Sequence, residues 1–287
     1  MKTRAVRSFS VLTMTVLSIG CVPAGGDSAE DAGENLQRER NAFLALETGP
    51  LPEAQTRWSE RTWRVNAGSV QHGDLAYAVQ TDKSDDVVRF ELRDSDRDRS
   101  PNDAPSVRRA ELSGSLYGDK RRLANALPLW GAMSFRHHAW TDPDAMRQHT
   151  GGVYGQIHMG SQFGGSPALA FRRTRDGLFR ITTRGQHDTG GTVRYEAPLS
   201  FDESHDLVYR LVLHPVRGSL AVWLDGKQII NTKNISIGHE SAQSYWNLGL
   251  YFSGGIDGRV IAEYANHRYP SPAALAQRAA RPEPWPR

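Results

Sequence analysis

The stretch Tyr245-Trp246-Asn247-Leu248-Gly249-Leu250-Tyr251 alternates between two kinds of side chain along its whole length. Successive side chains of a β-strand point to opposite faces, so this stretch predicts a strand with two distinct faces. One face is apolar and belongs in a core: Trp246, Leu248, Leu250 and Phe252. The other face is polar and aromatic, with a gap at Gly249 where another group can approach the backbone closely. A strand of this kind suits the floor of a binding groove.

From Trp63 to about His267 the chain has the pattern of many strands joined by turns. Short runs of β-branched and aromatic residues alternate with clusters of Gly, Asp, Asn and Pro. Asp176-Gly177 and Asp225-Gly226 stand between alternating runs and predict hairpins. The expected strands include Ser106–Gly114, Val153–Met159, Ser219–Leu224, Gln228–Asn231 and Trp246–Ser253. The pattern predicts an all-β domain over residues 59–270, a concanavalin-like β-jelly roll of two packed antiparallel sheets with a concave substrate groove.

The first 21 residues have the features of an export signal peptide. A basic start is followed by an apolar stretch from Phe9 to Ile19 and by small residues as far as Cys21. Because Cys21 is the single cysteine of the chain, no intramolecular disulfide is possible. Its position resembles that of the acylated cysteine of bacterial lipoproteins, and the alternative is an ordinary cleaved signal with an incidental cysteine. We expect an exported protein, either a lipoprotein of the cell envelope or an extracellular one.

Two further segments flank the expected β-domain. Residues 22–58 are rich in Gly, Ala, Glu, Asp and Arg, which is typical of a solvated, flexible tether. Residues 271–287 form a Pro- and Ala-rich tail with a short helix expected at Pro272–Arg281.

Composition excludes several functional classes. The net charge of +3 does not fit a polybasic nucleic-acid binder. There is no cluster of Cys and His at zinc spacing, no nucleophile elbow, and no phosphate-binding or dinucleotide-binding glycine loop. The paired-carboxylate strand of glycosidases, Glu-x-Asp-x-x-Glu, is also missing, which disfavours a glycoside hydrolase.

Arginine is nevertheless dense in one part of the chain: Arg172, Arg173, Arg175, Arg180 and Arg184. Four of them, Arg172, Arg173, Arg175 and Arg184, either line the groove, where they would bind further units of a polyanion, or form a solvated strand face.

Two other expected strands carry groups suited to chemistry. In Arg109-Ala110-Glu111-Leu112, Arg109 and Glu111 share one face, as a surface ion pair or as an arginine held for an anionic ligand. In Gly155-Gln156-Ile157-His158, Gln156 and His158 project together, and a histidine suits proton transfer near neutral pH.

With Asn247 and Tyr251, these residues form a set that fits one reaction class. Arg109, Gln156 and Asn247 can neutralise a carboxylate, His158 can serve as a base, and a phenol can give or take a proton. The proton at C5 of a uronic acid is acidic only when its carboxylate is neutralised, and donors placed there stabilise the enolate-like intermediate. A second group must then protonate the departing glycosidic oxygen at C4. The set therefore favours β-elimination.

The motifs Arg109-x-Glu111-Leu112, Gln156-Ile157-His158 and Tyr245-x-x-x-Gly249-x-Tyr251 resemble, in this order, those of β-jelly-roll polysaccharide lyases. These include alginate lyases, glucuronan lyases and heparin lyase I-like enzymes, and the resemblance covers about residues 60–268.

The resemblance implies a role for each matching residue. Arg109 and Gln156 would hold the substrate carboxylate, and His158 would help to neutralise it or act as the base. Tyr251 would be the general acid and, in syn elimination, also the base. Asn247 stands where alginate lyases have lysine, and Ser113 stands where an arginine often follows, so a glucuronate polymer becomes the more expected substrate.

Several expectations complete this interpretation. Further substrate contacts are assigned to Tyr245, Asn247, Glu111, Arg173, Arg175 and His138. The partner is an acidic polysaccharide and the protein a monomer, with no catalytic metal and no required cofactor. The acidic loop Asp94–Asp103 is a possible place for a structural Ca²⁺. The alternative function is a non-catalytic, lectin-like sugar-binding module.

Overall fold

The computed structural model describes residues 70–71, 77–81, 87–96, 107–113, 123, 125–140, 151–160, 167–174, 176–188, 190–242, 244–254, 256, 258–268 and 272–286. The expected signal peptide, Cys21 and the expected tether lie outside these ranges, and so does Arg175. No helix within the ranges is long and apolar enough to cross a membrane.

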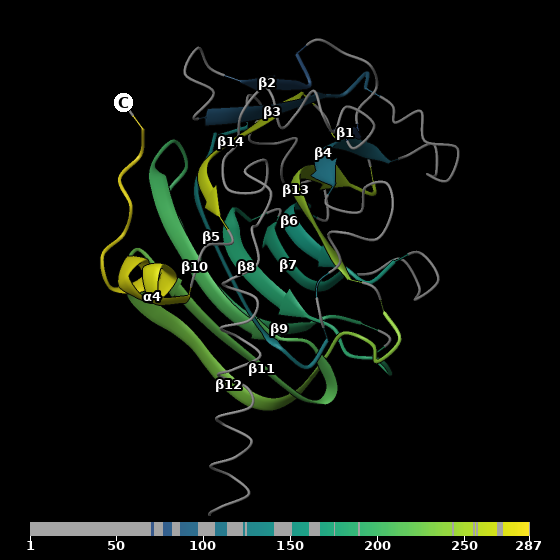
Figure 1. Ribbon diagram of the computed structural model, residues 1–287. Helices are drawn as coiled ribbons and strands as arrows, with labels where there is room; N and C mark the ends of the chain where they lie inside the picture. Colours follow the sequence, from purple (N-terminus) through teal and green to yellow (C-terminus); the bar gives the residue numbers. More distant parts are fainter. Residues whose placement is uncertain are drawn as a thin grey trace, which may run out of the picture. The chain divides into compact units, whose positions relative to one another are not determined.

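Two seven-stranded sheets form the fold. Sheet A has the order β1-β4-β13-β6-β7-β8-β9 and sheet B the order β12-β11-β10-β5-β14-β3-β2 (Figure 1). The strands of sheet A are β1 (Val70–Gln71), β4 (Arg108–Ser113), β13 (Tyr245–Phe252), β6 (Gly152–His158), β7 (Pro167–Arg173), β8 (Leu178–Thr183) and β9 (Thr192–Pro198). Those of sheet B are β12 (Lys227–Ile237), β11 (His214–Leu224), β10 (Ser204–Val212), β5 (Pro128–His137), β14 (Arg259–Arg268), β3 (Val87–Arg93) and β2 (Val79–Thr81).

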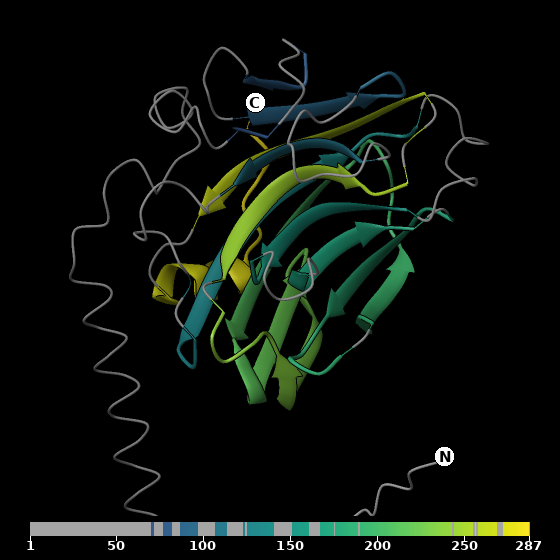
Figure 2. The ribbon, with the colours of Figure 1, turned by 90° about the vertical axis from the view of Figure 1, so that its right-hand side faces the viewer.

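Neighbouring strands are antiparallel throughout both sheets. Figure 2 shows the long strands lying in two layers. The expectation of an all-β jelly roll with two packed antiparallel sheets is thus confirmed. Asp176-Gly177 connects β7 to β8 and Asp225-Gly226 connects β11 to β12, and both glycines have positive φ, as such turns require.

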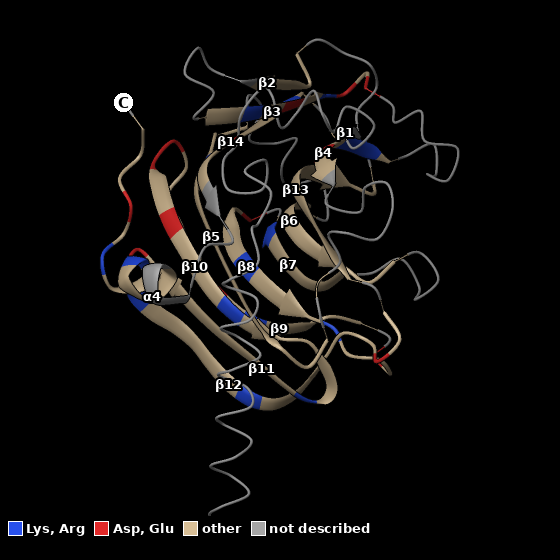
Figure 3. Cartoon of the chain, viewed as in Figure 1, with Lys and Arg blue, Asp and Glu red and all other residues tan. Residues whose placement is uncertain are grey.

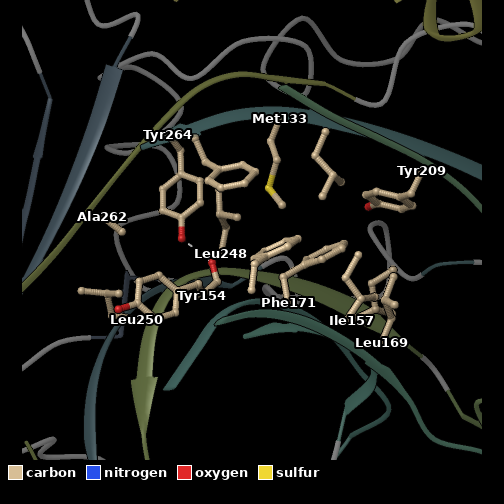
Figure 4. Packing of buried hydrophobic residues seen from close by; sticks show 14 of the residues in the cluster. Met133, Tyr154, Ile157, Leu169, Phe171, Tyr209, Leu248, Leu250, Ala262 and Tyr264 are labelled. Atoms are coloured by element: carbon tan, nitrogen blue, oxygen red, sulfur yellow. Dashed lines mark hydrogen bonds between the residues drawn. The ribbon is translucent and has the colours of Figure 1, made fainter. Parts of the chain in front are cut away.

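Apolar side chains from both sheets meet between the two layers and form the core. Leu248, Ile157 and Phe171 come from sheet A, and Met133 and Tyr264 come from sheet B (Figure 4). The alternation of the opening stretch is the cause, because every second side chain of β13 points into this layer. Leu248, Leu250 and Phe252 are buried, and the partly buried Trp246 packs against them.

Gly249 marks a bulge in β13. On β6, Leu248 pairs with Gly155 but Tyr251 pairs with Val153, so β13 has one extra residue between these two pairs. Gly249 has a φ of 129°, and a Cβ there would lie 2.2 Å from the carbonyl oxygen of Ala110 on β4. The group that approaches this glycine is therefore the backbone of the neighbouring strand.

The helix α4 (Pro272–Ala280) confirms the helix expected in the C-terminal tail. It lies on the outer face of sheet B, where Leu275 and Ala279 pack on Ala132 and Val208. A buried ion pair joins the same two elements, because Arg278 Nε lies 3.1 and 3.0 Å from the two carboxylate oxygens of Asp206.

Candidate active site

Three neighbouring strands of sheet A, β4, β13 and β6, bring the expected site residues to one face. The register pairs them across the strands: Tyr251 with Arg109, Asn247 with Gln156, and Tyr245 with His158. Residues directly opposite one another on neighbouring strands share a face. Leu248 and Ile157, which alternate with them, point into the core. The six side chains therefore lie on the outer face of sheet A, the face turned away from sheet B.

Glu111 is a buried carboxylate that holds two of these side chains. It has no exposed surface. It accepts a hydrogen bond from Gln156 Nε2 at 2.7 Å, and its Oε2 lies 3.6 Å from Arg109 Nε. Because the carboxylate takes one N–H of Gln156, the second N–H of that amide stays available for another acceptor. Glu111 was expected to contact substrate; its burial makes it a positioning residue for Arg109 and Gln156.

Arg109 and Tyr251 form the pair at one end of the face. The guanidinium carbon of Arg109 lies 4.8 Å from the centre of the Tyr251 ring. Both side chains retain exposed surface, with 16% of the Arg109 side chain accessible. A cation at this distance from a phenol stabilises negative charge that develops on its oxygen. The arrangement therefore suits a tyrosine that exchanges a proton.

His158 lies at the opposite end of the face, stacked on Tyr245. The ring centres are 5.3 Å apart with an angle of 29° between the planes. His158 Nδ1 accepts a hydrogen bond from the backbone N–H of Gly160 at 2.9 Å. A neutral imidazole that accepts at Nδ1 carries its proton on Nε2, so Nε2 is a donor in this arrangement.

Asn247 occupies the middle of the face, between Gln156 on β6 and Ser113 on β4. Only 4% of its surface is exposed. Its Oδ1 is buried and has no hydrogen-bond partner among the described residues. Buried acceptors are usually paired in folded proteins, so this oxygen is able to accept a hydrogen bond from a ligand.

A family model described as polysaccharide lyase matches residues 55–262, which is more than half of the chain. The chain belongs to this family. It is therefore a polysaccharide lyase, and membership favours an enzyme over the non-catalytic sugar-binding module. All three strands of the candidate site lie within the matched residues.

Several solved structures are similar to the lyase, and the first named here agrees with the jelly-roll fold. One is an endo-β-1,4-glucuronan lyase from the fungus Trichoderma reesei, with 13% sequence identity and a TM-score of 0.51 over 72% of this chain and 91% of that one. Another is an alginate lyase from Klebsiella pneumoniae, with 13% identity and a TM-score of 0.49 over 68% of this chain and 84% of that one. An alginate lyase from Corynebacterium sp. has 16% identity and a TM-score of 0.46 over 67% and 79% of the two chains. No curated protein sequence matches the lyase.

Arg173 of the lyase does not lie on the site face, so its expected contact with substrate was wrong. Its side chain points into the core and is 1% exposed. The guanidinium donates to His137 Nδ1 at 3.0 Å and to three backbone carbonyl oxygens, those of Gly177, Leu199 and Ser200. Burial lowers the pKa of Arg173 to about 10. Its role is to tie β7 to these loops.

His138 was also expected to contact substrate, and it lies elsewhere in the lyase. It directly follows β5, which belongs to sheet B. Its Nδ1 lies 2.8 Å from Asp202 Oδ1 and its Nε2 lies 3.3 Å from Glu263 Oε2. The contact with Glu263 is the main cause that raises the pKa of His138, against the effect of burial. Its position and partners indicate a structural role.

Arg172 is the arginine of β7 that does lie on the site face. It pairs with Val153 on β6 and with Arg180 on β8, and its side chain is half-buried. The sequence already indicates that Arg172 lies on the outer face, because Leu169 and Phe171 are the apolar positions of this strand. Alternation then places residue 173 inside and residue 172 outside.

No group of His, Cys, Asp and Glu side chains suited to holding a metal ion occurs in the part of the chain that the structure describes. Of the acidic loop Asp94–Asp103, only Asp94, Ser95 and Asp96 belong to that part. Asp96 accepts a hydrogen bond from the backbone N–H of Arg93 at 2.8 Å. The structural Ca²⁺ stays a prediction.

Proposed function

We propose that this polysaccharide lyase cleaves a uronic-acid polymer, of the glucuronan or alginate type, by β-elimination and leaves an unsaturated uronate end. The observation that carries the proposal is the placement of Arg109, Gln156, His158 and Tyr251 on one face of three neighbouring strands. Neutralisation of a carboxylate and transfer of a proton are the two needs of this reaction, and this face offers groups for both.

The substrate carboxylate would lie between Arg109, the free N–H of Gln156 and Nε2–H of His158. These donors neutralise it and stabilise the negative charge that spreads into it when the C5 proton leaves. Asn247 adds a neutral amide beside Gln156. Glu111 keeps Arg109 and Gln156 in place without meeting the substrate, because it is buried.

Tyr251 would move the proton. As the phenolate it takes the proton from C5, the C5 electron pair forms the C4=C5 double bond, and the C4–O bond breaks. The regenerated phenol then gives its proton to the departing glycosidic oxygen. Arg109 beside the ring favours the phenolate.

The hydrogen bond at His158 supports this division of labour. An imidazole that accepts at Nδ1 and donates at Nε2 cannot also take a proton at Nε2. We therefore assign His158 to the substrate carboxylate as a donor and assign both proton transfers to Tyr251, which corresponds to syn elimination.

A product assay tests the proposal. The chain lacking residues 1–21 is incubated with glucuronan, polymannuronate, polyguluronate and heparin, and the ultraviolet absorbance of the conjugated uronate is followed. We expect a rise with a glucuronate or alginate-type polymer. Shortening of the polymer without a rise in absorbance would show hydrolysis and refute the mechanism.

We propose further that the protein is exported and acts as a monomer. The basic start, the apolar stretch and the position of Cys21 support export, with acylation at Cys21. Mass spectrometry of the mature N-terminus tests this: an acylated Cys21 is the expected result. An N-terminus downstream of Cys21 would refute the lipid anchor, and retention of residues 1–21 would refute export.

A further inference from the structure

Arg172 lies in the same cross-strand row as Tyr251. The row runs from Arg109 through Tyr251 and Val153 to Arg172 and then to Arg180. At a strand spacing of about 4.8 Å, Tyr251 and Arg172 have their Cα atoms roughly 10 Å apart. All four charged or phenolic side chains of the row belong to the outer face of sheet A.

The charge of Arg172 is not balanced within the described residues. Its Nε donates to the hydroxyl of Thr182 at 3.2 Å, and no carboxylate of the described residues pairs with it. Arg180, the next arginine of the row, forms an ion pair with Glu196 on β9. Lys and Arg positions along these strands are blue in Figure 3.

The surroundings of Arg172 make this imbalance costly. Burial is the main cause that lowers its pKa, and the like charges of Arg184 and Arg180 lower it further. A cation that is half-buried among other cations is stabilised when an anion enters its site. A planar guanidinium recognises a carboxylate through two parallel hydrogen bonds.

We propose that Arg172 binds the carboxylate of a uronate unit adjacent to the cleaved one, and so makes the enzyme prefer consecutive acidic sugars. The inference rests on the proposed function, since it takes Tyr251 as the point of cleavage. The polymer would then cross β13, β6 and β7 along the row. Arg172 is a specificity residue, because it contacts the substrate away from the reacting atoms.

The test compares Arg172→Ala with Arg172→Lys and with Arg180→Ala. Arg180 is the matched control, because it lies one strand further along the same row and already has Glu196 as a partner. The initial rate of the ultraviolet rise is measured over a range of polymer and salt concentrations. Binding of the same polymer is measured by calorimetry in a Tyr251→Phe background, so that affinity is known without turnover.

For Arg172→Ala we expect KM and the dissociation constant to rise roughly tenfold at low salt, with kcat within about twofold. The difference from wild type should shrink as salt rises, because salt screens an interaction between charges. Lysine should restore part of the affinity, and Arg180→Ala should change KM by less than about threefold.

Two results would overturn the inference while the proposed function stands. The first is an unchanged KM and salt dependence in Arg172→Ala. The second is a fall in kcat at constant KM, which would mean that Arg172 acts on Tyr251 and not on a neighbouring sugar. Absence of an ultraviolet rise with wild type would instead refute the proposed function. In that case a tenfold loss of binding in Arg172→Ala would still support the arginine's role, and equal binding would refute it.

Discussion

The outer faces of both sheets carry ion pairs, such as Arg180 with Glu196 on sheet A, but they differ in the polar groups that are left without a partner. On sheet B three buried or half-buried carboxylates have partners of the opposite sign: Asp206 with Arg278, Glu263 with Arg136 and His138, and Glu91 with Arg89 and Arg93. On sheet A, Asn247 Oδ1 has no hydrogen-bond partner among the described residues. Arg172 has no carboxylate partner among the same residues.

This difference separates stability from function. The two charges of an ion pair already stabilise each other, so a ligand gains little free energy by binding to either of them. An unbalanced acceptor or cation is a cost in the free protein that a ligand of the right chemistry removes. Substitutions on sheet B should therefore change the free energy of unfolding, whereas substitutions on sheet A should change activity.

Removing one partner of the buried pair on sheet B should have the largest effect on stability. Arg278→Ala leaves Asp206 as a buried charge without its partner, and such losses cost about 3–5 kcal/mol. Chemical denaturation measures this. The control is the double variant Arg278→Met with Asp206→Leu, which should recover much of the loss because no charge is left unpaired. Equal stability of Arg278→Ala and wild type would contradict the comparison.

The buried carboxylate of sheet A should behave differently. Glu111→Gln keeps the shape of the side chain but removes the charge beside Arg109, so Arg109 and Gln156 are held less firmly. We expect kcat/KM to fall by roughly 10²-fold, since small displacements of positioning groups are costly. The unfolding midpoint should change far less than in Arg278→Ala. A variant that loses stability and keeps activity would assign Glu111 to the scaffold alone.

The bulge at Gly249 connects the two properties. Gly249→Ala places a Cβ against the carbonyl of Ala110 at a φ of 129°, which side-chain-bearing residues rarely adopt. A loss of about 1–3 kcal/mol in unfolding free energy is expected. Gly254→Ala is the matched control, because a Cβ there meets nothing within 4 Å. If both variants unfold at the same denaturant concentration, the bulge does not require glycine.

The smallest effect concerns pH and His138. Because Glu263 raises the pKa of this histidine in the folded state, its contribution to stability is fully present below the unfolded pKa of about 6.5 and is lost as pH rises through the folded value. Wild type should exceed His138→Ala in stability by more at pH 5.5 than at pH 8, by less than about 1 kcal/mol. Denaturation of both proteins at the two pH values measures the difference, and a constant difference would remove His138 from the charge balance of sheet B.

The alternation of apolar and polar residues was sufficient to predict which side chains of the site strands lie on each face of the sheet. The sequence predicted strands at Ser106–Gly114, Val153–Met159 and Trp246–Ser253. The observed strands β4, β6 and β13 begin and end within two residues of these bounds. Their order along the chain gives no direct indication that β13 lies between β4 and β6, because that adjacency arises from long-range pairing. Only the resemblance of the three motifs to lyases pointed to it.

Other features were missed for physical reasons. Strands β11 and β12 are longer than expected, since polar residues such as Thr232 and Lys233 continue the pairing at the edge of sheet B. Arg173 was misplaced because neighbouring arginines were considered as a group, although the alternation of Leu169 and Phe171 separates them. The sequence indicated that some group could approach the backbone at Gly249 but not which one, and the structure shows that it is the backbone of β4.

Tyr251→Phe is the most direct test of the central claim, which is that one tyrosine on the outer face of sheet A carries out the elimination. The variant removes the phenol oxygen and keeps the ring beside Arg109. With a polymer that wild type cleaves, we predict loss of the ultraviolet rise by at least roughly 10³-fold, with binding within about twofold of wild type. A variant that generates unsaturated uronate at the wild-type rate would contradict the account.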